Sequence, residues 1–185
     1  MTLIDSRPGI KAAYQRLSAE TGVYIDADLA VSRLGPPLEH ELAEWVPAER
    51  VPELSERYRE LYPRLAIEAS PAMPGAHEAL AAVRRHGGRT VVVTAKYEAN
   101  AKLHIEHLGL EPDNVVGGLW AEAKAEALRE YGAGIFVGDH KGDIRAARTA
   151  EALSVIVATG PFGPEELRRA GAQVVLDDLT HFPAW

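Results

Sequence analysis

An α/β fold built on a parallel sheet is predicted by three observations. From Pro71 onward, short apolar runs alternate with helical patterns, and strands joined by helices of this length pair in parallel through right-handed crossovers. Between residues 22 and 70 the pattern is wholly helical, which indicates a small helical insertion. The apolar run Ile135-Phe136-Val137 is typical of a buried parallel strand, and it ends at Gly138-Asp139, a pair suited to a sharp turn.

The first residues resemble the end of a strand-to-helix loop. Leu3 and Ile4 are apolar, residues 5–9 have turn chemistry, and residues 10–21 have a helical pattern. The strand that should precede such a loop is not among these residues. We therefore expect the first core strand to be missing from residues 1–185.

Three helices are predicted in the insertion. Asp26 or Asp28 can cap the first, Gly35-Pro36-Pro37 ends it, the second covers 38–45, and Pro52 can begin the third. Beyond the insertion the pattern alternates between the two kinds of element. The predicted helices cover 78–86, 98–108, 121–131, a segment that begins near residue 143, and 164–170, and the predicted strands cover 90–93, 115–116, 135–137, 155–157 and 174–176.

Composition limits the class of protein. The 185 residues are 46% hydrophobic and 25% charged, as in an ordinary globular chain with one core and a small satellite. The net charge of −7 argues against a nucleic-acid partner, and the absence of cysteine excludes disulfides, thiolate zinc sites and cysteine nucleophiles. No apolar run approaches the roughly 18 to 20 residues of a membrane span, and the first residues lack a signal-peptide pattern. We therefore expect a cytoplasmic protein without a membrane partner.

Two carboxylates, Asp139 and Asp143, are predicted at the carboxyl end of the strand 135–137. This edge is where open α/β sheets bind ligands, and Mg²⁺ takes one or two carboxylates together with phosphate and water. In the alternative interpretation, Asp139 only makes a turn and Asp143 only caps the helix that follows. The two residues alone do not decide between these interpretations.

Further polar residues leave neighbouring elements at the same edge. Thr94 ends the strand 90–93 and could donate to a phosphate, although it could also be a plain helix cap. Lys124 begins a helix before the strand 135–137, and its alternative is a solvated helix cation. His104 and His107 lie three apart, and we expect a solvated or partly packed helix face there because no third metal ligand is suitably spaced. His140, inside the acidic turn, is a better candidate for a position near a ligand.

Taken in order, Thr94, Lys124 and the stretch from Gly138 to Asp143 resemble the haloacid dehalogenase-like hydrolases. Thr94 is similar to the second motif of that superfamily, Lys124 to the third, and Gly138-Asp139-x-x-x-Asp143 to the fourth. Residues 1–6 are similar to the tail of the first motif, D-x-D-x-T-L-x-D-S, so both of its aspartates would lie upstream of residue 1. Either the chain begins at an internal methionine of a longer protein, which we favour, or the protein lacks its nucleophile.

The resemblance implies a fold and a mechanism. The fold would be a Rossmann-like, three-layer parallel core at 1–12 and 70–185 with a helical cap at 13–69, as in the branch similar to phosphoglycolate phosphatases. Mg²⁺ would bridge Asp139 and the phosphate, Lys124 would neutralise charge while held by Asp143, and an upstream aspartate would form an aspartyl-phosphate. The substrate contacts would come from Thr2, Thr94, Ala95 and Lys124.

The implied activity is that of a phosphatase of a small phosphorylated metabolite, acting as a monomer or homodimer. A dehalogenase of the same superfamily and a catalytically silent phosphate-binding or regulatory module are the alternatives. In the superfamily the missing strand lies at the centre of the sheet. Its absence would leave unpaired backbone groups on both neighbours, each costing on the order of 1–3 kcal/mol if buried. We therefore expect the chain to be unstable, or another strand to fill the position.

Overall fold

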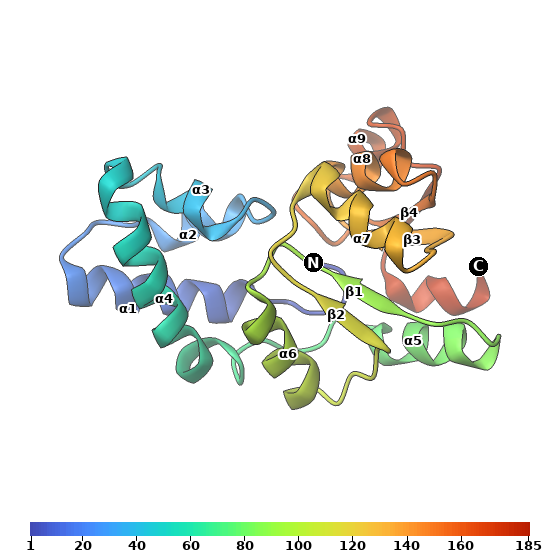
Figure 1. The fold of residues 1–185 in the computed structure, drawn as a ribbon, viewed down its shortest axis with the longest axis horizontal. Helices are drawn as coiled ribbons and strands as arrows, with labels where there is room; N and C mark the ends of the chain where they lie inside the picture. Colours follow the sequence, from blue (N-terminus) through green and yellow to red (C-terminus); the bar gives the residue numbers. More distant parts are fainter.

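A computed structural model describes all residues, 1–185, and confirms the α/β class (Figure 1). Helices and parallel strands alternate after a helical N-terminal third. The α-helices are α1 (Arg7–Thr21), α2 (Ala27–Ser32), α3 (Leu38–Leu42), α4 (Val51–Ala66), α5 (Ala76–Arg85), α6 (Glu98–His107), α7 (Lys124–Glu130), α8 (Lys141–Thr149) and α9 (Pro164–Arg169). The strands are β1 (Val91–Val93), β2 (Asn114–Val116), β3 (Ile135–Gly138), β4 (Leu153–Val157) and β5 (Val174–Leu176), and short 3₁₀ helices cover Ala48–Arg50 (η1), Ala121–Ala123 (η2) and Leu179–Ala184 (η3).

Most predicted elements lie within a few residues of the observed ones, and the differences have local causes. The first helix starts at Arg7 because Pro8 fits its first turn. The predicted helix 121–131 is in fact the 3₁₀ turn η2 followed by α7, since Ala121 has a positive φ of 48°. The helix predicted to begin near Asp143 starts at Lys141.

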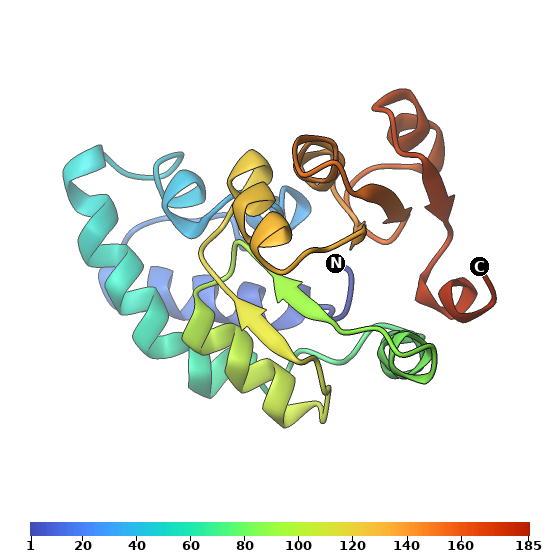
Figure 2. The same ribbon diagram turned by 45° about the vertical axis from the view of Figure 1, so that its right-hand side comes forward.

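The strands form two separate parallel groups where one parallel sheet was predicted. β1 pairs with β2, and the second group has the order β3-β4-β5. No strand joins β1 to β3, and the two groups stand apart in Figure 2. The interruption lies between β1 and β3, inside the array of strands, and the resemblance places the missing strand at the centre of the sheet.

Backbone groups along this interruption have no partner. In a sheet, alternate residues of a strand form backbone hydrogen bonds with the strand on one side, and the residues between them face the strand on the other side. The residues of β1 and β3 that do not bond to β2 or β4 therefore face the interruption. Thr94 N–H donates to Val116 O at 3.0 Å, and Gly134 O accepts from Leu153 N–H at 2.9 Å. By this alternation Val93 in β1 and Val137 in β3 turn their N–H and C=O groups into the gap, where no hydrogen bond is formed.

The interruption predicts an alternating pattern of amide exchange. The amide protons of Val93 and Val137 should exchange at least about tenfold faster than those of their strand neighbours Val92 and Phe136, because Val92 and Phe136 are hydrogen-bonded to an adjacent strand. Hydrogen exchange followed by NMR measures this difference residue by residue. Equal protection at all four positions would contradict an open gap and would indicate that another strand fills it in solution.

The helical N-terminal part has its own hydrophobic cluster. Helix α1 packs against α4, and Tyr14, Leu17, Leu54 and Tyr62 are buried between them. Asp26 caps α2, as predicted, by accepting from Leu29 N–H at 3.0 Å. Three smaller clusters lie among the remaining elements. The division of the chain at residues 12/13 and 69/70 stays a prediction.

None of the helices is both long enough and apolar enough to cross a bilayer.

Candidate active site

The acidic turn after β3 is a compact strand-to-helix connection. β3 ends at Gly138, and a side chain there would meet Asp143, because an added Cβ would lie 2.4 Å from the Asp143 Cβ. His140 caps α8, and its Nδ1 accepts from Gly142 N–H at 2.9 Å. Asp143 is the third residue of α8, in its first turn as predicted, and its side chain takes part in a capping box by accepting from the backbone N–H of His140. The turn brings Asp139 and Asp143 to the carboxyl end of β3 as predicted.

Asp143 holds Lys124 in a buried ion pair. Lys124 Nζ lies 2.7 Å from Asp143 Oδ1, and the two residues are 7% and 4% exposed. The second oxygen, Oδ2, accepts the N–H groups of Asp139 and His140 at 3.1 Å each. Lys124 is therefore not the solvated helix cation of the alternative interpretation. Both oxygens of Asp143 are used inside the protein, so its carboxylate fixes other groups in place.

Asp139 presents its carboxylate to the chain's first residues, Met1 and Thr2. Thr2 Oγ1 donates to Asp139 Oδ1 at 2.7 Å, and the amino group of Met1 forms an ion pair with Oδ2. Burial by itself would raise the pKa of Asp139, but the Met1 amino group, the Thr2 hydroxyl and Lys124 together outweigh it and lower the pKa below its ordinary value. Asp139 is therefore an ionised carboxylate in a place that attracts cations.

Thr94 follows β1, on the other side of the interruption. Its Oγ1 accepts from Lys96 N–H at 3.2 Å, while α6 begins only at Glu98 with Tyr97 as its N-cap. Thr94 is thus not the cap of the helix that follows, and its hydroxyl hydrogen is free to donate. Ala95 continues the same loop.

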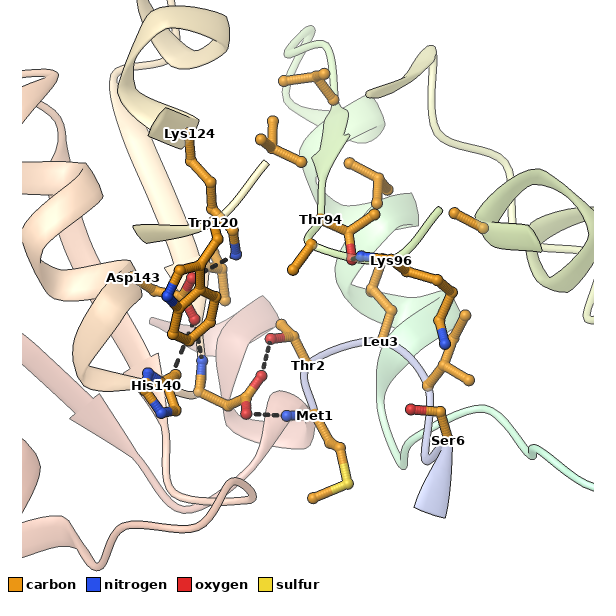
Figure 3. A pocket seen from close by; sticks show the side chains of 18 of the residues that line it. Met1, Thr2, Leu3, Ser6, Thr94, Lys96, Trp120, Lys124, His140 and Asp143 are labelled. Atoms are coloured by element: carbon orange, nitrogen blue, oxygen red, sulfur yellow. Dashed lines mark hydrogen bonds and ion pairs between the residues drawn. The ribbon is translucent and has the colours of Figure 1, made fainter. Parts of the chain in front are cut away.

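One cavity of about 1010 Å³ is lined by all six residues for which a site role was predicted. It runs from the acidic turn to the interruption between β1 and β3, and Figure 3 shows Lys124 and Thr94 on its walls. The six residues are Thr2, Thr94, Ala95, Lys124, Asp139 and Asp143. The structure brings them together; their roles in binding or catalysis stay predictions.

The cavity offers few side chains that could bind a divalent cation. No three His, Cys, Asp or Glu side chains form a ligand group. Asp143 is tied to the buried ammonium of Lys124 and to two backbone N–H groups. Asp139 contacts only the Thr2 hydroxyl and the Met1 amino group, so it is the carboxylate that a cation could bind in place of that amino group. Mg²⁺ keeps most of its waters and needs only one or two carboxylates beside a phosphate. The donor set therefore fits Mg²⁺ with Asp139 as its ligand.

The helical part covers the site through the loop between α2 and α3. Gly35 in this loop leaves no room for a side chain, because an added Cβ would lie 2.8 Å from His140 and 2.9 Å from Trp120. The His140 ring packs against Trp120 and Phe162 at centroid distances of 4.9 and 4.8 Å. Burial lowers the pKa of His140, which agrees with an Nδ1 that accepts a hydrogen bond. His140 thus lies at the boundary between the helical part and the site.

Two residues that line the cavity were not predicted to do so, and the prediction for one histidine was wrong. Trp120 and Lys96 both line the cavity; the signal for Lys96 was its place two residues after Thr94 at a strand end. His104 was expected to be solvated or partly packed, but it is fully buried and its Nε2 lies 2.9 Å from Tyr62 Oη. His107 is exposed, as expected.

Comparison with known proteins gives consistent relatives. The family model described as haloacid dehalogenase-like hydrolase matches residues 1–148. The probable phosphatase IndB of Dickeya dadantii is 28% identical over 199 residues, covering 97% of this chain and 86% of that protein. The phosphoglycolate phosphatase of Caulobacter vibrioides is 26% identical over 212 residues, covering 98% and 85%.

Solved structures confirm the predicted fold. A predicted phosphatase from Clostridium acetobutylicum superposes with a TM-score of 0.84 at 23% identity, over 98% of this chain and 92% of that one. A haloacid dehalogenase-like protein from Streptococcus pneumoniae gives the same TM-score at 22% identity, over 99% and 92%. The Rossmann-like core with a helical cap is therefore the fold of this chain.

Proposed function

This chain belongs to the haloacid dehalogenase-like hydrolases, and from that membership we propose that it is a Mg²⁺-dependent phosphatase of a small phosphorylated metabolite. The relatives support the reaction class, because two proteins named as phosphatases align with nearly the whole of this chain. The observation that carries the proposal is the meeting of a carboxylate, an ammonium and a hydroxyl, from Asp139, Lys124 and Thr94, on one cavity.

Each of these groups has a task in phosphoryl transfer. Asp139 would hold Mg²⁺, which when bound supplies positive charge to a phosphoryl oxygen. Lys124 would neutralise the charge that develops on the phosphoryl group, and the Thr94 hydroxyl would donate to one of its oxygens. Asp143 would act as a positioning residue, since it fixes the ammonium of Lys124 at 2.7 Å.

The proposal also concerns the nucleophile of the reaction. The reaction that the resemblance implies begins with attack of an aspartate carboxylate on phosphorus, followed by hydrolysis of the aspartyl-phosphate by water. Asp143 is held in the ion pair with Lys124, and Asp139 is assigned to the cation. We therefore propose that the nucleophile is an aspartate that precedes Thr2 by a few residues.

The test measures phosphate release from small phosphomonoesters with Mg²⁺ present. We compare the chain as numbered, an Asp139→Asn variant as a blank, and a protein read from further upstream in the gene, if that reading contains D-x-D before Thr2. Release is expected only from the longer protein, with phosphate binding by both chains. Failure of the longer protein to release phosphate would contradict the phosphatase. A stop codon in place of D-x-D, with phosphate still bound, would support the silent phosphate-binding module instead.

A further inference from the structure

Three buried polar side chains on the cavity wall form no hydrogen bond within the protein. They are Tyr14 of α1, Tyr58 of α4 and Asn100 of α6, which are 3%, 6% and 5% exposed. The polar atoms of all three remain accessible to a water-sized molecule, and the cavity is the space that these residues line. Buried hydroxyl and amide groups normally have a hydrogen-bond partner, so these three groups can bind a ligand that enters the cavity.

The three residues lie where the helical part meets the core. Helix α4 packs against α1 and against α6 (Figure 2). The ring centroids of Tyr14 and Tyr58 are 4.9 Å apart, and those of Tyr58 and Tyr62 are 5.5 Å apart. The Tyr62 hydroxyl is already bonded, to His104 Nε2 at 2.9 Å and to Lys96 Nζ at 2.5 Å. A row of three aromatic rings therefore borders the cavity, and two of their hydroxyls are left for a ligand.

The helical part gives this end of the cavity an apolar wall without net charge. Its apolar residues there include Ile10, Leu34 and Leu38. The charged side chains that the helical part contributes to the lining, Glu39 and Arg59, form an ion pair with each other. Burial raises the pKa of Tyr14 and of Tyr58, so both hydroxyls are neutral. The wall thus offers apolar contact and a few neutral hydrogen bonds.

The same cavity holds the groups assigned to the phosphate. Thr94 and Lys124 line it together with Tyr14, Tyr58 and Asn100. A monoester with its phosphate at Thr94 and Lys124 can therefore extend its alcohol part toward the tyrosines. Pockets of this kind select their ligand by apolar contact and orient it with a small number of polar groups.

We propose that this end of the cavity binds an uncharged aromatic ring with a hydrogen-bonding substituent, so that the substrate is the phosphate monoester of a phenol or a similar aromatic alcohol. The inference rests on the proposed phosphatase function and adds the substrate class. The rings of Tyr14 and Tyr58 contact the substrate ring, and aromatic pairs favour tilted and offset arrangements. The two hydroxyls and the amide of Asn100 bind the substituent. A sugar would need more hydrogen-bond partners than the apolar wall provides.

The experiment compares four ligands by isothermal titration calorimetry of the chain as numbered, with Mg²⁺ present. Inorganic phosphate and ethyl phosphate report the phosphate position, phenyl phosphate adds a ring, and 4-carbamoylphenyl phosphate adds an amide to the ring. We expect phenyl phosphate to bind about tenfold more tightly than ethyl phosphate, because the ring buries more apolar surface. The carbamoyl ester should bind about tenfold more tightly than phenyl phosphate, because phenyl phosphate leaves the buried polar groups unpaired.

Variants assign the second preference to the three polar side chains. Tyr14→Phe combined with Tyr58→Phe keeps both rings and removes both hydroxyls, and Asn100→Leu removes the amide. Each should reduce the advantage of the carbamoyl ester over phenyl phosphate, and the advantage of phenyl over ethyl phosphate should remain. The tyrosine variant should not lower the melting temperature of the ligand-free protein, because its hydroxyls have no partner in the protein to lose.

A matched control removes a hydroxyl outside the cavity. Tyr24 is 74% exposed, and Tyr24→Phe should leave all four affinities unchanged. If Asn100→Leu does not fold, the tyrosine variant and the unmodified chain still decide the result.

Each outcome has a distinct meaning. Equal binding of phenyl and ethyl phosphate by the unmodified chain would overturn the substrate class, and so would a carbamoyl advantage that survives in the tyrosine variant. A tyrosine variant that melts earlier and keeps its affinities would show that the hydroxyls serve the fold, which also overturns the inference. In these cases binding of inorganic phosphate leaves the phosphatase proposal standing. Binding of none of the four ligands would overturn both the inference and the proposed function.

Discussion

Replacing Asp143 with alanine is expected to lower the free energy of unfolding by about 3–5 kcal/mol. The variant leaves the ammonium of Lys124 buried without its partner, and it removes the acceptor of the N–H groups of Asp139 and His140. Both costs are desolvation costs that the native carboxylate offsets, because Asp143 is only 4% exposed. Urea denaturation followed by circular dichroism measures the difference.

Two further variants make this prediction specific. Arg145→Ala breaks an exposed ion pair between α8 and Glu122, and it should leave the urea midpoint nearly unchanged because exposed pairs contribute little. Adding Lys124→Met to Asp143→Ala should recover part of the loss, since it removes the uncompensated charge. A loss in Asp143→Ala no larger than in Arg145→Ala would show that the buried pair does not stabilise the fold.

The acidic turn could be predicted because its determinants are local. The apolar run of β3, the glycine at its end and the two carboxylates four residues apart all lie within ten residues. Gly138 must be small because Asp143 folds back onto it, so the spacing and the glycine belong to one structure. Such a turn has a sequence pattern that a single chain reveals.

Contacts between distant residues could not be predicted in this way. Lys124 and Asp143 are 19 residues apart, and the family resemblance was needed to pair them. Lys96 and Tyr62 are 34 residues apart in the sequence, and Tyr62 and His104 are 42 residues apart, so no local pattern predicts these contacts. His104 was misjudged for this reason: its helix has little amphipathic character, and its burial depends on a tyrosine of another helix.

The interruption of the sheet shows a second limit of sequence patterns. β1 is a buried-type apolar run, and such a run has the same appearance whether it has one neighbouring strand or two. The pairing of β1 is decided by what lies on its other side, which is where Val93 is left without backbone partners. The pattern of the first residues predicted that a strand was missing, and only the resemblance placed it at the centre of the sheet.

Replacing Asp139 with asparagine is expected to remove the Mg²⁺ dependence of phosphate binding, with a loss of about 100-fold in the affinity measured with Mg²⁺ present. Asparagine keeps the shape of the side chain and can still accept from Thr2, whose hydroxyl lies 2.7 Å away, but it carries no charge for a hard cation. Calorimetric titration with phosphate, with and without Mg²⁺, measures the effect.

Asp113→Asn, a change at an exposed carboxylate that bonds to Thr90, is the control and should behave like the unmodified chain. Because Lys124 and Thr94 are untouched in Asp139→Asn, weak binding of phosphate without Mg²⁺ should remain, and this separates loss of the cation from collapse of the cavity. A dependence on Mg²⁺ that persists in Asp139→Asn would show that the cation is held by other groups.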